Sequence, residues 1–272
     1  YYPWGRTGRN TGRTPSGTWE DYLKFMDAQL TELLTNYGPI GGIWFDGWWD
    51  KPDADWQLER QYTLIHRLQP GCLIGNNHHK APFEGEDFQM FERDLPGQNK
   101  AGYSADAEIS ALPLESCETM NNTWGYNIND RNFKSTKQLI HTLVGAAGNN
   151  ANLLLNVGPR PGGDFPEGSV RHLKEIGEWM RTYGETIQGT RAGIIPQQDW
   201  GVTTQKGNKL YIHILNLNKT ELLLPTTDRK IKSIVCFKDQ TPVKYKKTKE
   251  GILLQLNEVP TDIDHIVEII WK

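Results

Sequence analysis

The sequence predicts an α/β protein, a (β/α)8-like TIM barrel lacking its N-terminal strands, followed by an antiparallel β-sandwich. Over roughly the first 190 residues, helical spacing of apolar residues alternates with short apolar runs, as in repeated β/α units. After residue 190, β-rich runs follow at intervals of roughly 15 to 20 residues with no helical pattern between them. We therefore expect a barrel portion in residues 1–190 and a β-sandwich domain in residues 191–272.

The first β/α unit is predicted between residues 18 and 45. Thr18 is a suitable helix N-cap, Glu20 lies in the first turn, and Gly38 with Pro39 ends the helical pattern. Apolar residues recur along one face of this helix: Trp19, Tyr22, Leu23, Met26, Leu30, Leu33 and Leu34. The apolar run at residues 43–45 then predicts a buried parallel strand.

The same alternation predicts the later elements. We expect helices over residues 55–69, 135–147 and 169–187, and strands over residues 72–75, 87–91 and 152–159. In the sandwich we expect strands over residues 209–215, 231–237, 251–256 and 265–270. Residues 93–134 show no periodic pattern, and a loop of that length is usually functional or conceals an element.

The number of strands bears on the architecture. The predicted elements amount to about four β/α units, whereas a closed barrel needs eight strands. Either the sheet is open, or the front of a barrel precedes Tyr1, and we favour the second interpretation. An open half-barrel leaves strand edges unpaired, so we expect this chain alone to fold poorly and to be inactive.

Composition excludes several classes of protein. The formal net charge of −3 gives no basic footprint for nucleic acid, and no apolar run is long enough to span a membrane. Cys72, Cys117 and Cys236 are widely spaced and form neither a metal-ligand pattern nor a disulfide framework. The sequence therefore predicts neither a metal site nor a bound cofactor.

The candidate site is centred on residues 39–50. Asp46 directly follows the first predicted strand, at the end where α/β folds place their chemistry, and Gly47 lets the chain turn away. Trp44, Trp48 and Trp49 surround this carboxylate with flat apolar faces, which suit the C–H face of a sugar ring. The alternative is a turn or helix-capping aspartate beside core tryptophans.

Glycoside hydrolysis generally needs a second carboxyl group, one of the two acting as nucleophile or base and the other as acid. The candidates are Glu84, Glu86, Asp87, Glu92, Glu115 and Glu118. Glu92 is favoured because it ends a predicted strand, beside Met90 and Phe91, whose apolar side chains favour a protonated carboxyl. Each acid taken alone is more simply a solvated surface charge, so the prediction depends on the acids and the aromatic residues together.

Four motifs, in order along the chain, resemble the α-L-fucosidases of glycoside hydrolase family 29. They are Tyr-Pro-Trp-Gly-Arg at residues 2–6, Gly-Gly-Ile-Trp-Phe-Asp-Gly at residues 41–47, Trp-Gly-Tyr at residues 124–126, and Asn-Leu-Leu-Leu-Asn-Val-Gly-Pro at residues 152–159. The resemblance implies an exo-acting retaining glycosidase that releases terminal α-L-fucose from fucosylated glycans. It also implies a periplasmic or extracellular location.

The resemblance implies a role for particular residues. Asp46 is expected to be the nucleophile and Glu92 the acid/base, with Glu115 as a fucose contact and the alternative acid/base. Leu114 stands where the family usually has tryptophan before that second acid, which leaves the role of Glu115 open. Further sugar contacts are expected as follows: Trp44 and Trp124 on the ring and methyl group, His78 and His79 lining the site.

The resemblance also leads to a test of whether N-terminal strands are missing. Family members carry sugar-binding histidines on strands before the Tyr-Pro-Trp-Gly segment, and nothing here corresponds to them. An added N-terminal segment of roughly 100 to 150 residues is expected to rescue hydrolysis of an aryl α-L-fucoside.

Other readings stay open at this point. One is a retaining hydrolase of a related sugar such as an α-galactoside, and another is a carbohydrate-binding protein without turnover. A third is a lectin-like role for the sandwich, where Trp200 and Tyr211 are the candidate stacking residues. Long loops such as residues 93–113 are expected to set the linkage preference.

Overall fold

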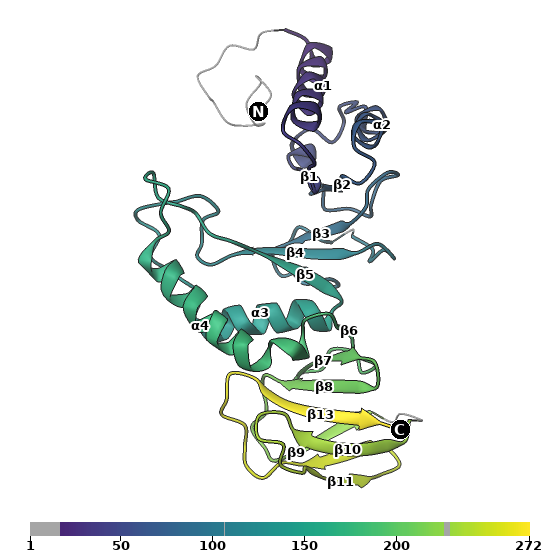
Figure 1. Ribbon diagram of the computed structural model, residues 1–272, viewed down its shortest axis with the longest axis vertical. Coiled ribbons are helices and arrows are strands. Elements are labelled where there is room, and N and C mark those ends of the chain that lie inside the picture. The colour runs from purple at the N-terminus through teal and green to yellow at the C-terminus, as the bar shows by residue number, and fades with distance from the viewer. Residues whose placement is uncertain (1–16, 106, 226–228) are drawn as a thin grey trace. The chain divides into compact units, whose positions relative to one another are not determined.

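The computed structural model describes residues 17–105, 107–225 and 229–272, and it has the predicted parallel β/α portion followed by antiparallel sheets (Figure 1). The chain divides into two compact units. Unit 1 comprises residues 1–92 and 99–114, and unit 2 comprises residues 93–98 and 115–272. The predicted boundary after residue 190 falls inside unit 2 and stays a prediction. The motif at residues 2–6 lies outside the described residues.

Helix α1 (Trp19–Asn36) opens unit 1 and begins where the sequence predicts. The hydroxyl of Thr18 accepts from the backbone N–H of Asp21, and the carboxylate of Asp21 accepts from the backbone N–H of Thr18. This capping box pairs backbone donors that the first helical turn would otherwise leave unpaired. The predicted apolar face is largely correct, although Leu33 is 44% exposed.

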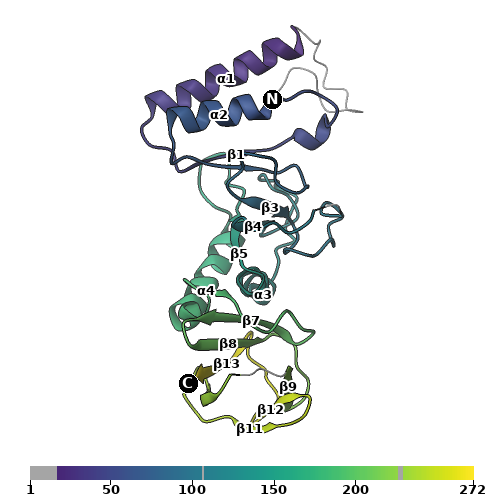
Figure 2. The same cartoon turned by 90° about the vertical axis from the view of Figure 1, so that its right-hand side faces the viewer.

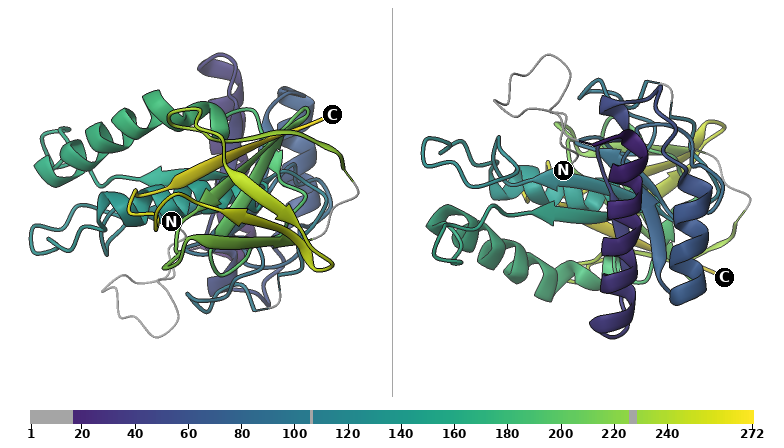
Figure 3. Two further views of the ribbon diagram at one scale, coloured as in Figure 1. Left: turned by 90° about the horizontal axis from the view of Figure 1, so that it is seen from below. Right: turned by 90° about the horizontal axis from the view of Figure 1, so that it is seen from above.

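The strands of unit 1 form a short parallel sheet. Strand β1 (Gly42–Phe45) pairs with β2 (Leu73–Asn76), and helix α2 (Leu58–Leu68) connects them. Helices α1 and α2 run side by side (Figures 2 and 3). The core between helices and sheet contains these buried residues: Leu30, Leu34, Tyr62, Ile65, Cys72 and Ile74.

The burial of β1 differs from the prediction of a strand covered on both faces. Ile43 and Phe45 pack against the core, whereas Gly42 and Trp44 are exposed. Successive side chains of a strand point to opposite faces, so only one face of β1 meets the helices. The other face carries Trp44 and leads directly to Asp46.

Two further segments of unit 1 shape the site. The 3-10 helix η1 (Trp48–Asp50) follows Gly47, whose φ of 90° lies in the left-handed region that glycine adopts without strain. Strand β3 (Gln89–Glu92) continues from Phe88, which forms a parallel bridge with Gly75. Glu92 therefore ends a strand, as predicted.

The N-terminal part of unit 2 contains a strand that was not predicted from the sequence. Strand β4 (Leu114–Thr119) occupies part of the predicted loop at residues 93–134 and is adjacent to β5 (Ala151–Asn156). Helices α3 (Thr136–Gly148) and α4 (Glu167–Tyr183) lie where helices were predicted. Ser135 and Gln138 form a second capping box at the start of α3.

The antiparallel part of unit 2 has two sheets. One has the order β10-β13-β8-β7-β6 and the other β11-β12-β9. Their bounds are β6 (Arg191–Ala192), β7 (Gly201–Lys206), β8 (Lys209–Ile214), β9 (Glu221–Pro225), β10 (Ile231–Cys236), β11 (Lys244–Lys247), β12 (Gly251–Gln255) and β13 (His265–Trp271). A 3-10 helix, η2 (Gly184–Thr186), precedes them. Residues of both sheets share one core, which includes Ile212, Leu224, Leu254 and Ile269.

The lectin-like reading of this region is wrong for the residues that were put forward. Trp200 is 9% exposed and Tyr211 is 2% exposed, because both belong to buried clusters. A sugar needs an accessible ring face to stack on, so neither side chain can serve. No helix among the described residues is long and apolar enough to cross a membrane.

Candidate active site

The ladder between β1 and β2 brings two strand ends together. Phe45 is the register partner of Asn76, so the next residues, Asp46 and Asn77, leave the sheet side by side. The backbone N–H of Asn77 donates to the carbonyl oxygen of Phe45 at 2.9 Å, which extends the ladder by one bond. The carboxyl ends of parallel strands are where such folds place reactive groups.

Asp46 is exposed and oriented by two donors. Its Oδ1 accepts from the indole Nε1 of Trp49 at 3.2 Å and from Nδ2 of Asn77 at 3.2 Å. Trp44 stands two residues earlier and is 38% exposed, so it shares the uncovered face of the strand. The carboxylate is thus accessible, held in one orientation and next to an apolar ring.

Glu92 lies within the same group of side chains. Its Oε2 accepts from Nδ2 of Asn77 at 2.8 Å, and Nε2 of His79 is 3.7 Å away. The side chain of Glu92 is 17% exposed, so it is more sheltered than Asp46. Because one nitrogen donates to both carboxylates, the two bonds limit the separation of the accepting oxygens to at most 6.0 Å.

His79 lies beside Glu92 in this group of side chains. Burial lowers its pKa from the ordinary value, although the charges of Glu92 and Asp46 act in the opposite direction. The ring is therefore mainly neutral near pH 7, and it stacks on Tyr103 with centroids 5.2 Å apart. Its φ of 62° is costly for a residue other than glycine, and such strain often occurs at functional sites.

His78 points into a buried polar network. It is 3% exposed, with Nε2 3.1 Å from both carboxylate oxygens of Glu86 and Nδ1 3.1 Å from the backbone nitrogen of Lys80. Tyr62 donates to the same carboxylate at 2.9 Å and accepts from Asn76 at 2.9 Å. The imidazole ring of His78 also packs on the ring of Phe83. This geometry makes His78 a support beneath residues 77–79, and its predicted contact with substrate stays a prediction.

Glu115 and Trp124 belong to unit 2. Glu115 is half-buried on β4, between the buried residues Leu114 and Ser116. The guanidinium of Arg93 lies 5.0 Å from the ring of Trp124, and its Nη2 donates to the carbonyl oxygen of Asn122 at 2.8 Å. A cation–π contact with Arg93, which directly follows β3 in the chain and belongs to the same unit, therefore holds the indole.

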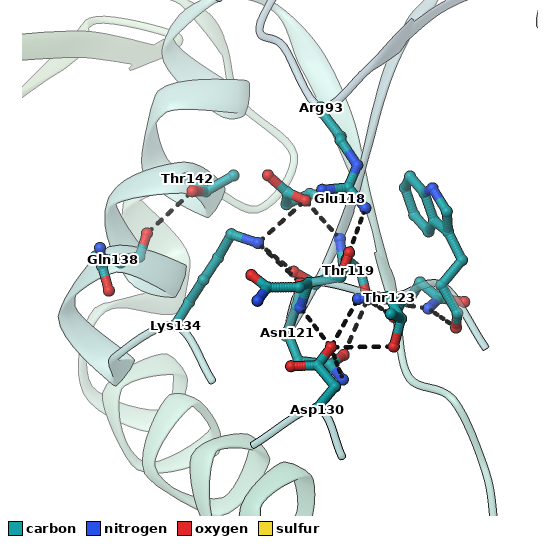
Figure 4. Close-up of polar contacts among 12 residues, drawn as sticks. Arg93, Glu118, Thr119, Asn121, Thr123, Asp130, Lys134, Gln138 and Thr142 are labelled. Carbon is teal, nitrogen blue, oxygen red and sulfur yellow. Dashed lines mark hydrogen bonds and ion pairs between the residues drawn. The ribbon is translucent and has the colours of Figure 1, made fainter. Parts of the chain in front are cut away.

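The loop that carries Trp124 is organised by Asp130 (Figure 4). One carboxylate oxygen, Oδ2, accepts from the backbone N–H groups of Asn122 and Thr123, from the hydroxyl of Thr123 and from the amide of Asn121. At the other end of the loop, Nζ of Lys134 lies 3.2 Å from Oε1 of Glu118. Side chains, rather than regular backbone pairing, thus fix the position of Trp124.

Sequence reasoning missed two residues of the site. It did not assign any function to Asn77, and it treated Trp49 as an apolar face rather than as a hydrogen-bond donor to Asp46. The sequence did contain a signal for Asn77. This residue directly follows the strand that neighbours the strand before Asp46, so its side chain was a candidate for the same strand-end site. Among the described residues, no group of three or more His, Cys, Asp or Glu side chains is arranged to hold a metal ion.

Comparison with known proteins gives matches to one family. The family model for alpha-L-fucosidase matches residues 3–185. Alpha-L-fucosidase 1 of Arabidopsis thaliana is 27% identical over 192 residues, which covers 65% of this chain and 37% of that protein. A putative alpha-L-fucosidase of Caenorhabditis elegans is 28% identical over 177 residues, covering 61% of this chain and 34% of that protein.

Solved structures give the same result. Alpha-L-fucosidase isoenzyme 1 from Paenibacillus thiaminolyticus has a TM-score of 0.78 and 30% identity, over 100% of this chain and 69% of that chain. A Bacteroides thetaiotaomicron alpha-L-fucosidase, solved as a covalent intermediate trapped with 2-fluoro-fucosyl fluoride, has a TM-score of 0.76 and 22% identity, covering 93% and 62%. At that identity the likeness is one of fold. The chain spans about a third of the curated relatives it matches.

Proposed function

The chain belongs to the alpha-L-fucosidase family, and on that premise we propose that the protein releases terminal α-L-fucose from fucosylated glycans with retention of configuration. Asp46 is the proposed nucleophile and Glu92 the proposed acid/base. The reaction is a double displacement, in which a covalent glycosyl-enzyme forms and is then hydrolysed.

One observation carries this proposal, namely the limit of 6.0 Å between the accepting oxygens of Asp46 and Glu92. Retaining glycosidases hold their two carboxyl groups about 5 to 5.5 Å apart, whereas inverting enzymes need about 6.5 to 9.5 Å to admit a water molecule. The separation here supports direct attack by one carboxylate rather than attack by an intervening water.

The surroundings of the two acids support their division of labour. In the first step, the exposed carboxylate of Asp46 attacks the anomeric carbon while Glu92 gives a proton to the departing glycosidic oxygen. In the second step, Glu92 takes a proton from water, the water oxygen attacks the same carbon, and the bond to Asp46 breaks. Glu92 is held beside Asp46 by the amide of Asn77, which suits a group that exchanges protons with the departing oxygen and then with water.

Sugar binding is assigned to the aromatic residues. Trp44 presents an accessible ring on the same strand face as Asp46, which suits packing against the fucose ring. Trp124 and Glu115 are proposed as further fucose contacts, and His79 as a neutral polar group lining the site. The periplasmic or extracellular location stays a prediction.

Chemical rescue tests the assignment. Asp46→Gly and Glu92→Ala are assayed on an aryl α-L-fucoside with and without azide, in the chain extended by an N-terminal segment of roughly 100 to 150 residues, and the configuration of the fucosyl azide is determined. Rescue of Asp46→Gly with inverted configuration, and of Glu92→Ala with retained configuration, is expected, because azide replaces the nucleophile in one case and the second-step water in the other. Rescue of Glu115→Ala in place of Glu92→Ala would transfer the acid/base role to Glu115.

The same enzyme preparation distinguishes the other readings. Stronger competitive inhibition by a galactose-type than by a fucose-type iminosugar would indicate an α-galactosidase. A carbohydrate-binding protein without turnover would keep its function unchanged in Asp46→Asn, whereas a hydrolase loses turnover and keeps sugar binding.

A further inference from the structure

Asn77 donates hydrogen bonds from one amide nitrogen to both proposed catalytic carboxylates. Its Nδ2 lies 3.2 Å from Oδ1 of Asp46 and 2.8 Å from Oε2 of Glu92. A primary amide carries two N–H groups, so each carboxylate receives one. The geometry points to Asn77 as a positioning residue that holds the two carboxylates at the separation needed for double displacement, an inference that rests on the proposed function.

Asn77 is held in place by contacts other than its bonds to the two carboxylates. The residue is 2% exposed, and its backbone N–H is bonded to the carbonyl oxygen of Phe45 at 2.9 Å. The backbone of Asn77 is therefore anchored to the sheet that also carries Asp46, and burial leaves the side chain little room to move. An anchored donor acts as a fixed reference point, whereas a mobile one would follow the carboxylates.

The orientation of the amide is set by its acceptors. With the amide flipped, its oxygen would face two carboxylates and both hydrogen bonds would be lost. In the orientation observed, the buried Oδ1 has no hydrogen-bond donor among the described residues. Leaving a buried acceptor unpaired is unfavourable, so the two bonds to Asp46 and Glu92 outweigh that cost.

Removing the amide of Asn77 should impair the catalytic step and leave sugar binding nearly unchanged. Without the shared donor, the side chains of Asp46 and Glu92 no longer have a common anchor. We expect Asn77→Ala to lower kcat about 100-fold, the loss that a misplacement of about 1 Å can cause. KM should change by less than about threefold, because the aromatic sugar contacts remain and only the reacting geometry is lost.

Two matched variants separate donation from packing. Asn77→Asp keeps the size of the side chain but replaces both N–H donors with a carboxylate oxygen, so it should lose at least as much kcat as Asn77→Ala. Asn76→Ala is the control, because Asn76 is 5% exposed and its amide donates to Tyr62 at 2.9 Å, not to either carboxylate. It should lower the melting temperature and leave the KM and kcat of surviving folded protein close to wild type.

Crystal structures of the full chain provide a readout that does not depend on turnover. In Asn77→Ala the accepting oxygens of Asp46 and Glu92 are expected to move beyond 6.0 Å, and in Asn76→Ala they should stay within that limit. An unchanged separation in Asn77→Ala, or wild-type kcat in Asn77→Asp, would overturn the positioning role. Absence of fucosidase turnover in the wild-type chain even after addition of an N-terminal segment of roughly 100 to 150 residues would instead contradict the proposed function, and the crystallographic comparison would still decide the role of Asn77.

Discussion

At the scale of single residues, the candidate site depends on polar side chains whose neighbours hold them in one orientation. His79 and Arg93 are both non-glycine residues with left-handed backbones, at φ 62° and 57°, and each adjoins a proposed functional residue in its own unit. His79 lies near Glu92, and Arg93 holds Trp124. Such strain persists only where surrounding contacts impose it, which is typical of functional loops.

Asp130 provides a test of the loop around Trp124 through its response to pH. Burial acts to raise the pKa of this carboxyl group and is the largest single effect, but hydrogen bonds from Thr123, Asn132 and Asn122 together lower it from the ordinary value of 3.8. A lowered pKa in the folded state stabilises the loop fully above the ordinary value. That contribution is lost as the pH falls through the lowered value.

The amide proton shifts of Asn122 and Thr123 measure this transition. We expect them to titrate together with a midpoint below 3.8, the ordinary value for this carboxyl group. Asp130→Asn should abolish the titration of both amides and increase the mobility of the loop, because the anionic acceptor is lost at every pH. A midpoint at or above the ordinary value would contradict the assignment of Asp130 as the hydrogen-bonded anchor of the loop.

At the scale of elements, the sequence was most informative where periodicity and end signals coincide. Thr18 and Ser135 were both found as helix starts, because a capping hydroxyl precedes an apolar stripe at helical spacing. Strand β4 was missed because Glu115, Ser116 and Glu118 break the apolar pattern, although the strand buries Leu114 and Cys117. A polar strand is recognisable only from its tertiary surroundings.

The packing of β2 against β3 gives a prediction about one glycine. A Cβ atom at Gly75 would lie 2.3 Å from Cζ of Phe88 and 2.5 Å from Cε of Met90, well inside van der Waals contact. Gly75→Ala should therefore lower the free energy of unfolding of unit 1 by about 1 to 3 kcal/mol through overpacking. Urea denaturation, with hydrogen exchange of the α2 amides as the readout, measures the change in the free energy of unfolding.

Gly71→Ala is the matched control. A Cβ at Gly71 meets nothing within 4 Å, and this glycine does not have the left-handed φ that disfavours alanine. Its effect on stability should be within about 0.5 kcal/mol, as for most surface substitutions. Equal stability of the two variants would mean that β2 and β3 do not approach as closely as the structure shows.

At the scale of the whole molecule, the sequence predicted the fold class and placed Asp46 and Glu92 at strand ends. It could not show that Asn77 joins them, because that contact depends on which strands are neighbours and on their register. Nor could it show that Trp200 is buried, since aromatic residues have the same sequence signal in a core and at a binding surface. Register and burial are properties of the assembled fold.

The hydrophobic cores predict how the molecule unfolds. The cluster around Ile65 contains only residues of unit 1, and the cluster around Leu254 contains only residues of unit 2. Both side chains are 0% exposed. Truncating either to alanine should cost about 2 to 5 kcal/mol, because the substitution removes buried methyl groups and leaves a cavity. We expect each loss to be confined to the unit that carries the substitution.

Native-state hydrogen exchange distinguishes local from global effects, because each amide reports the free energy of the opening that exposes it. Ile65→Ala should reduce protection in α2 and leave β12 unchanged, and Leu254→Ala should do the reverse. Each variant is thus the control for the other, with the same kind of cavity in a different core. If both variants reduced protection equally in α2 and β12, the molecule would unfold as one cooperative unit, and separate cores would not imply separate stability.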